Sequence, residues 1–146
     1  MEGNTVKQLS VFVSNETGTI AKVTRALYDK GVDLRAISVA DTEDYGILRL
    51  LVSDAALAKA CLEEGNYMHD MTDVTVVAVP DVPGGLSMIL ELMANNGVGI
   101  EYMYSLIDRG TSDAYMVFRA TDTEELHRIL FENGIKTVSG EALGLR

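Results

Sequence analysis

The sequence predicts an α+β fold built from two copies of one β-α-β-β-α-β unit, residues 1–72 and residues 73–146. Two observations predict this duplication. When the 146-residue sequence is slid along itself by 66 positions, the segment 11–18 falls on 77–84, and both segments pass from an apolar run into a glycine turn. Extended apolar runs and helical apolar patterns then follow in the same order in both halves.

The first half of each copy predicts a strand, a turn and a helix. The strands are rich in Val and Leu, and the helices place their apolar side chains on one face. A glycine just past each helix fits the left-handed residue that ends a helix. In copy one the strand is Gln8–Ser14, the turn is Asn15–Gly18 and the helix-ending glycine is Gly31. In copy two the strand is Val74–Val79, the turn is Asp81–Gly85 and the helix-ending glycine is Gly97.

Two further strands, a second helix that starts near Asp54 or Asp122, and a short last strand complete each copy. The polar residues 70–73 indicate a turn between the copies. The strands are Leu34–Ala40, Ile47–Val52 and Tyr67–Thr72 in copy one, and Ile100–Ile107, Ala114–Ala120 and Ile135–Ser139 in copy two.

This order of elements is that of the ferredoxin-like fold. A unit of roughly 70 residues buries little surface by itself, whereas two units that pair side by side also bury an edge strand. We therefore expect the two copies to form one antiparallel sheet of eight strands, with all four helices on one face.

The composition argues against several classes of protein. Asp and Glu outnumber Lys and Arg by 22 to 12, and the basic residues are scattered, so no nucleic-acid partner is expected. No apolar run approaches the roughly 18–20 residues of a membrane span, and the start of the chain lacks the pattern of a signal peptide. We expect a cytoplasmic protein without a membrane partner. Cys61 is the single cysteine, which excludes an intramolecular disulfide.

The sequence contains no recognisable catalytic or cofactor motif. A G-x-G-x-x-G pattern begins at Gly97 but fails, because Tyr102 stands in the place of the third glycine. His69 and His127 have no second ligand at zinc spacing, and no nucleophile is paired with a base. We therefore expect no enzymatic activity, no cofactor and no metal.

The two turns between the first strand and first helix of each copy are the informative places. Each puts a short polar side chain, Asn15 or Asp81, and a glycine at the start of a helix. Unpaired N–H groups and partial positive charge at a helix start suit a carboxylate, and Asn15 or Asp81 can accept a hydrogen bond from an ammonium group. Together these features predict a free amino acid as ligand. The alternative is an ordinary helix cap with proline in the first turn.

On these residues the chain resembles two tandem ACT domains. The resemblance rests on the turns Asn15–Gly18 and Asp81–Gly84, each preceded by a strand, and on Gly31-Val32-Asp33-Leu34 and Gly97-Val98-Gly99-Ile100 at the end of each helix. The family pattern D/N-x-P-G is whole in copy two, whereas Thr17 replaces the proline in copy one. The resemblance implies an ACT-type fold and regulation by a small molecule, usually an amino acid, bound between paired modules.

The resemblance also implies which residues bind the ligand. In the family, the glycine turn of one module faces the second-strand start of its partner, so the copy-two turn would face residues 33–35 and the copy-one turn residues 99–101. Because Gly99 lacks the usual Asn or Asp side chain, we expect the two sites to differ in affinity. The implied ligand-binding residues are Asn15, Glu16, Thr17, Gly18, Asp33, Leu34, Asp81, Val82, Pro83, Gly84, Gly85, Gly99, Ile100 and Glu101.

These observations lead to one main hypothesis and one alternative. The main hypothesis is a non-catalytic sensor that binds a free amino acid at the interface of the two repeats and regulates amino-acid metabolism. The alternative is a regulatory subunit of a biosynthetic enzyme that acts by protein contact, because acetolactate synthase small subunits contain such modules. We further expect a homodimer, because Phe12 and Val76 would make the uncovered face of the sheet apolar.

Overall fold

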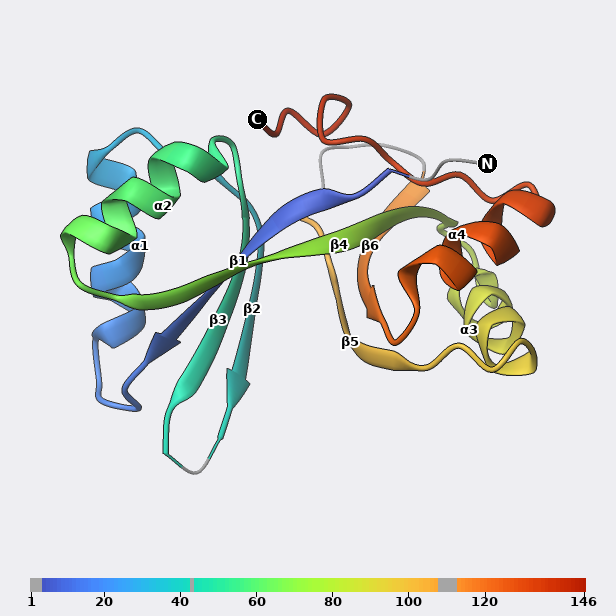
Figure 1. The fold of residues 1–146 in the computed structure, drawn as a ribbon, viewed down its shortest axis with the longest axis horizontal. Helices are drawn as coiled ribbons and strands as arrows, with labels where there is room; N and C mark the ends of the chain where they lie inside the picture. The colour runs from blue at the N-terminus through green and yellow to red at the C-terminus, as the bar shows by residue number, and fades with distance from the viewer. Residues whose placement is uncertain (1–3, 43, 108–112) are drawn as a thin grey trace. The chain divides into compact units, whose positions relative to one another are not determined.

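The computed structural model describes residues 4–42, 44–107 and 113–146 (Figure 1). These residues form six antiparallel strands and four helices, so the predicted α+β class is confirmed. In chain order the elements are β1 (Val6–Val13), α1 (Thr19–Asp29), β2 (Leu34–Asp41), β3 (Gly46–Val52), α2 (Ala55–Glu64), β4 (Met68–Pro80), α3 (Gly85–Asn95), β5 (Ile100–Ser105), β6 (Asp113–Ala120) and α4 (Thr123–Glu132).

The chain folds as two compact units. Lys7–Thr72 together with Gly144–Arg146 form one unit, which we call repeat 1. Residues 4–6 together with the described residues of the range 73–143 form the other, which we call repeat 2. In repeat 1, β3 lies between β1 and β2, and in repeat 2, β6 lies between β4 and β5. Each repeat therefore has its third strand between its first and second strands, as the ferredoxin-like order requires.

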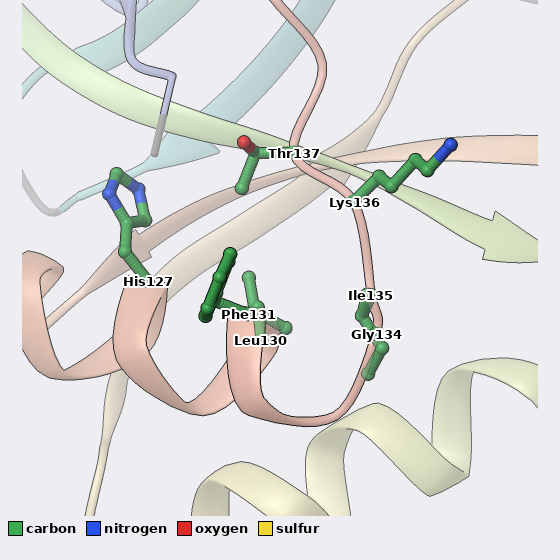
Figure 2. Close-up of a pocket in the computed structure, with 7 residues that line it drawn as sticks. All are labelled: His127, Leu130, Phe131, Gly134, Ile135, Lys136 and Thr137. Carbon is green, nitrogen blue, oxygen red and sulfur yellow. The ribbon is translucent and has the colours of Figure 1, made fainter. Parts of the chain in front are cut away.

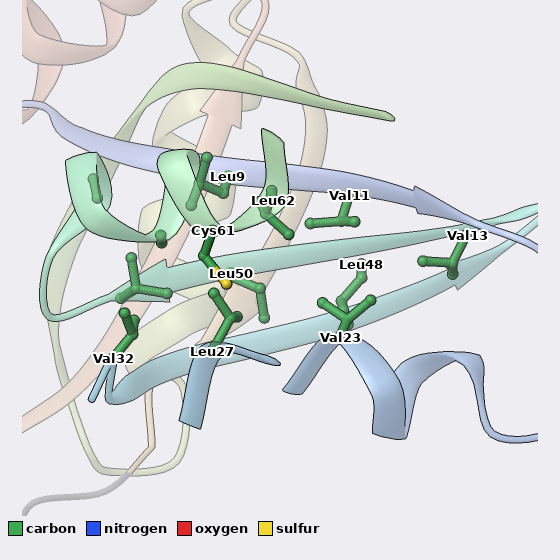
Figure 3. Packing of buried hydrophobic residues seen from close by; sticks show 13 residues of the cluster. Leu9, Val11, Val13, Val23, Leu27, Val32, Leu48, Leu50, Cys61 and Leu62 are labelled. Carbon is green, nitrogen blue, oxygen red and sulfur yellow. The ribbon is translucent and has the colours of Figure 1, made fainter. Parts of the chain in front are cut away.

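The core of repeat 1 lies between one face of its sheet and the helices α1 and α2 (Figure 3). Leu9 and Val11 on β1 pair with Leu50 and Leu48 on β3. Because successive side chains of a strand point to opposite faces, these alternate positions all face the helices. Cys61 on α2 is buried in the same cluster, so the prediction that it is a small core residue is confirmed.

The core of repeat 2 is built in the same way. Val77 and Val79 on β4 pack with Phe118 on β6 and with Ile89 and Met93 on α3. The apolar face of α4 completes this cluster with Leu126, Ile129 and Leu130. The helical apolar spacing seen in the sequence therefore corresponds to real burial in both repeats.

Each of the four described helices ends on a left-handed residue. Gly31 and Gly97 have φ of 78° and 71°, which confirms the helix ends predicted at these glycines. Gly134 follows α4 with φ 68°, and Asn66 follows α2 with φ 57°. The next N–H after each of these residues reaches back across the last turn, as Val32 does to Leu27 O at 3.0 Å.

The predicted turn at residues 70–73 is wrong, because β4 runs without interruption from Met68 to Pro80. Residues 70–73 contain neither glycine nor proline. From Met68 to Met71 exposed and partly buried side chains alternate, with Met68 and Asp70 exposed and His69 and Met71 partly buried. The alternation stops there, because Thr72 is partly buried and Asp73 is exposed. Asp70, one of the polar residues that suggested a turn, is therefore an outward-facing position of a strand.

The predicted eight strands are also wrong, since the described residues form six. β4 spans the predicted last strand of copy one and the predicted first strand of copy two. The predicted strand Ile135–Ser139 is reduced to a single bridge between Val77 and Thr137, supported by a hydrogen bond from Val138 N–H to Val76 O at 2.8 Å.

The face of the sheets opposite the helices is less exposed than expected. Val76, which was expected on this uncovered face, is 0% exposed, and Ser10 on β1 is only 8% exposed. Phe12 is half-buried, and its ring meets the ring of Tyr45 edge-on at 5.8 Å between centroids. The expectation of a bare apolar face is therefore wrong at these positions.

Candidate functional site

The two predicted turns place a left-handed glycine at the start of a helix. Gly18 precedes α1 with φ 89°, and Gly84 precedes α3 with φ 88°. Such values suit glycine and strain other residues. Beyond the neighbouring backbone, none of the described residues places an atom within 4 Å of the position that a Cβ would take on either glycine. The backbone at both helix starts is therefore open to a small molecule.

The helices that follow these turns lack the side-chain caps found on the other two helices. Asp54 accepts a hydrogen bond from Leu57 N–H, and Asp122 accepts one from Glu125 N–H, both at 3.1 Å. No side chain caps α1 or α3. Aspartate side chains therefore cap α2 and α4, whereas the helices after the two glycine turns have no such cap bond.

The backbone amides at the starts of α1 and α3 are only partly satisfied. The first amide of each helix, from Thr19 or Gly85, donates to a carbonyl of the turn before it, at 3.3 Å and 3.0 Å. For the second amide of each helix, from Ile20 or Leu86, the described part of the chain supplies no hydrogen-bond acceptor. These free N–H groups, at the positive end of a helix, can bind a carboxylate.

The two turns are held in different ways. In repeat 1 the hydroxyl of Thr19 donates to Glu16 O at 2.9 Å and lies 3.2 Å from the hydroxyl of Ser14. In repeat 2 the corresponding residues are Pro80 and Gly85, and a Cβ on Gly85 would lie 2.1 Å from Pro80 O. Sequence reasoning missed the structural roles of Ser14 and Thr19, although their hydroxyls flank the turn.

The side chain of Asn15 ties its turn to the hairpin between β2 and β3. Its amide nitrogen donates to Thr42 O at 3.2 Å, and its amide oxygen would lie 3.3 Å from a Cβ on Gly46. Asp81 is exposed, and within the described residues no group forms a hydrogen bond or an ion pair with its carboxylate. The two turns therefore differ in the polar group that each can offer to an ammonium.

Both second-strand starts are held by a clasp that the sequence did not reveal. Asp33 N–H donates to the Ser53 hydroxyl at 2.9 Å, and Ser53 N–H donates to Asp33 O at 2.8 Å. Gly99 and Thr121 repeat this pair of bonds at 3.0 Å and 2.9 Å. We call these the Ser53 clasp and the Thr121 clasp. Ser53 and Thr121 both directly precede the aspartate that caps the next helix, and this shared position was the available signal.

Acidic side chains near both second-strand starts have arginine partners within their own repeat. Asp33 Oδ2 lies 3.4 Å from Arg35 Nε, and Glu101 Oε2 lies 3.3 Å from Arg119 Nε. Ile100 is partly buried beside the core of repeat 2. The two strand starts therefore carry similar ion pairs on different residues.

Asp33 and Leu34 also line a pocket of about 460 Å³ in repeat 1. The same pocket is lined by α1, including Arg25 and Tyr28, which sequence reasoning missed. The Arg25 guanidinium lies 5.2 Å from the centre of the Tyr28 ring, a cation–π contact. The pocket therefore joins a carboxylate, a guanidinium and an aromatic ring.

The turn and the second-strand start of repeat 1 lie at opposite ends of β2. Asn15 contacts Thr42, just after the strand ends, whereas Asp33 lies just before it begins. Eight residues of extended chain span about 25 Å. One repeat cannot bring these two predicted regions together by itself.

A second pocket, of about 350 Å³, lies between α4 and the segment that follows it (Figure 2). Figure 2 shows His127, Phe131 and Lys136 among the residues around it. His127 Nε2 lies 2.9 Å from the Thr75 hydroxyl. Burial lowers the pKa of His127 below its usual range, because a charged imidazole loses hydration there.

The lowered pKa of His127 predicts a loss of stability in mild acid. Below the ordinary pKa of 6.5 the unfolded chain binds a proton more readily than the folded chain does. The stability that the neutral His127 side chain contributes is fully present above pH 6.5. It is lost as the pH falls toward the lowered pKa that His127 has in the folded chain. Urea unfolding between pH 7.5 and 5 should show a steeper decrease for the native chain than for His127→Gln. His69→Gln, which keeps His127, should retain the decrease, and equal slopes for native and His127→Gln chains would contradict the prediction.

Comparison with known proteins places the chain in a family. Residues 4–145 match the family model described as an ACT domain pair, so the chain belongs to that family. The crystal structure of protein BT0572 from Bacteroides thetaiotaomicron is 33% identical, with a TM-score of 0.88 over 96% of both chains.

Two further relatives are regulatory subunits. The ligand-free regulatory subunit of aspartate kinase from Thermus thermophilus shares the fold at 16% identity, with a TM-score of 0.60 over 90% of this chain and 93% of that chain. The acetolactate synthase small subunit of Buchnera aphidicola is 29% identical over 69 residues. That match covers 47% of this chain and 43% of the relative, so the chain corresponds to less than half of that protein.

Two general properties concern the described residues alone. None of their helices is both long enough and apolar enough to cross a membrane. Nor do the described His, Cys, Asp and Glu side chains form a group of three or more placed to hold a metal ion.

Proposed function

We propose that this ACT domain pair is a non-catalytic cytoplasmic sensor that binds a free amino acid at the glycine turns before α1 and α3 and regulates amino-acid metabolism. One observation carries the proposal. α2 and α4 are capped by aspartates, whereas α1 and α3 begin at left-handed glycines and keep free amides. A ligand carboxylate satisfies these amides and meets the positive end of the helix.

The ammonium of the ligand would be recognised by the polar residue of each turn. Asp81 offers an exposed carboxylate in repeat 2, and Asn15 offers its amide oxygen in repeat 1. Since the turn and the second-strand start of one repeat lie about 25 Å apart, residues such as Asp33 and Glu101 would complete a site only from a facing ACT module. A second copy of the chain would also supply such a module, so we further propose a homodimer.

The test is calorimetric titration of the whole chain with each of the twenty proteinogenic amino acids. Asp81→Ala should weaken binding about 10- to 100-fold, because a hydrogen bond to a charged group contributes about 1.5–3 kcal/mol. Glu63→Ala is the matched control, since its carboxylate lies on α2 and pairs with Lys59 at 3.4 Å. No heat and no thermal shift with any amino acid would disprove the sensor.

A second function, regulation of a biosynthetic enzyme by protein contact, is favoured by the similarity to the acetolactate synthase small subunit. The two functions are compatible. Purified acetolactate synthase catalytic subunit should then bind the chain and change its turnover without added amino acid. Unchanged turnover and no co-elution on gel filtration would count against this function.

A further inference from the structure

The last three residues, Gly144–Arg146, belong to repeat 1 although they follow repeat 2 in the chain. We call them the C-terminal tail. Arg146 N–H donates to Ser53 O at 3.0 Å, and Ala55 N–H lies 3.4 Å from Arg146 O. The tail is thus bonded on both sides of Asp54, between β3 and α2.

The tail bonds to the residue that clasps Asp33. Ser53 uses its hydroxyl and its N–H to hold the backbone of Asp33, and it uses its carbonyl to accept Arg146 N–H. A continuous series of hydrogen bonds therefore runs from the tail through Ser53 to the second-strand start. Any displacement of the tail acts directly on the clasp.

The tail also packs on the arginine that pairs with Asp33. The side chain of Arg35 is 22% exposed, and its Nε lies 3.4 Å from Asp33 Oδ2. On the other side, a Cβ on Gly144 would lie 3.0 Å from Arg35 Nη2. Gly144 has φ 72°, so this close approach depends on glycine in both space and backbone geometry. The guanidinium is therefore held between Asp33 and the tail.

Repeat 2 is built differently at the corresponding position. It keeps a clasp, between Gly99 and Thr121, but Glu101 stands where repeat 1 has Arg35. Glu101 pairs with Arg119, which also donates to Asp73 O at 3.0 Å. The arrangement of tail, arginine and aspartate belongs to repeat 1.

We infer that the C-terminal tail positions Asp33 as one wall of an amino-acid-binding site. It holds Ser53 and Arg35, and these two residues fix the backbone and the carboxylate of Asp33. A wall that is already ordered lowers the cost of ordering it when a ligand binds. The ligand part of this inference rests on the proposed function, whereas the positioning part does not.

The test compares three forms of the whole chain with the native form. Gly144→Val introduces both backbone strain and contact with Arg35, and a chain that stops at Leu143 removes the tail. Gly134→Val is the matched control, because Gly134 has φ 68° and an open Cβ position in repeat 2. Hydrogen exchange of the Asp33 and Ser53 amides reports on the clasp without any ligand, and calorimetry with each of the twenty amino acids reports on binding.

Both tail variants should speed exchange of the Asp33 and Ser53 amides at least about tenfold and weaken amino-acid binding about three- to tenfold. Gly134→Val should leave both readouts unchanged. Unchanged exchange in the tail variants overturns the inference, and so does faster exchange with unchanged or tighter binding. If the native chain binds no amino acid, the sensor proposal fails, while the exchange data still decide whether the tail positions Asp33.

Discussion

Gly85→Ala is expected to lower the free energy of unfolding of repeat 2 by about 3 kcal/mol, at the upper end of what overpacking usually costs. A Cβ on Gly85 would lie 2.1 Å from Pro80 O and 3.1 Å from Pro80 C. Both contacts are to backbone, so no side-chain rotation relieves them, and α3 must move away from the end of β4. Urea unfolding, with hydrogen exchange of Phe118 as the readout for repeat 2, measures the loss.

A second glycine provides the control for this prediction. Gly99→Ala would bring its Cβ 3.1 Å from the methyl group of Thr121, a side chain that can shift by a few tenths of an ångström. We expect a cost below about 1 kcal/mol. If Gly85→Ala and Gly99→Ala lowered the free energy of unfolding equally, the start of α3 would not lie as close to the Pro80 carbonyl as in this structure.

The strands and helices were largely predictable because their apolar periods match their burial. Leu9, Val11 and Val13 alternate along β1 and are all buried against the helices. The error at residues 70–73 shows the limit of this reasoning. Composition alone does not distinguish a polar turn from a strand with an acidic outward position, whereas the exposed Asp70 between the partly buried His69 and Met71 fits the strand.

The glycine turns were predictable because a positive φ at a helix start demands a particular residue type, and that demand is local. The clasps and the tail were not predictable. Asp33 and Ser53 are 20 residues apart, and Ser53 and Arg146 are separated by all of repeat 2, although both belong to repeat 1. Such contacts depend on how strands and termini pack, and the position of Ser53 and Thr121 directly before a capping aspartate does not by itself say which strand start they hold.

Valine at the two left-handed helix caps should remove the proposed binding sites one at a time. We expect two bound amino acids per native chain, one for Gly18→Val, one for Gly84→Val and none for the double variant, as measured by the stoichiometry of calorimetric titration. A β-branched residue disfavours the left-handed backbone, by at least about 1–2 kcal/mol. Its side chain would also cover the amides that the carboxylate needs, whereas the open space around both glycines avoids a clash with the fold.

Gly31→Val separates loss of binding from backbone strain. Gly31 has φ 78° and an equally open Cβ position, but it lies at the end of α1, away from the free amides. This variant should lose stability as Gly18→Val does and still bind two amino acids, because the start of α1 is intact. A double Gly18→Val, Gly84→Val variant that binds two amino acids would show that the ligand carboxylate does not sit on the starts of α1 and α3, and the helix-start part of the proposed function would be wrong even if the chain is a sensor.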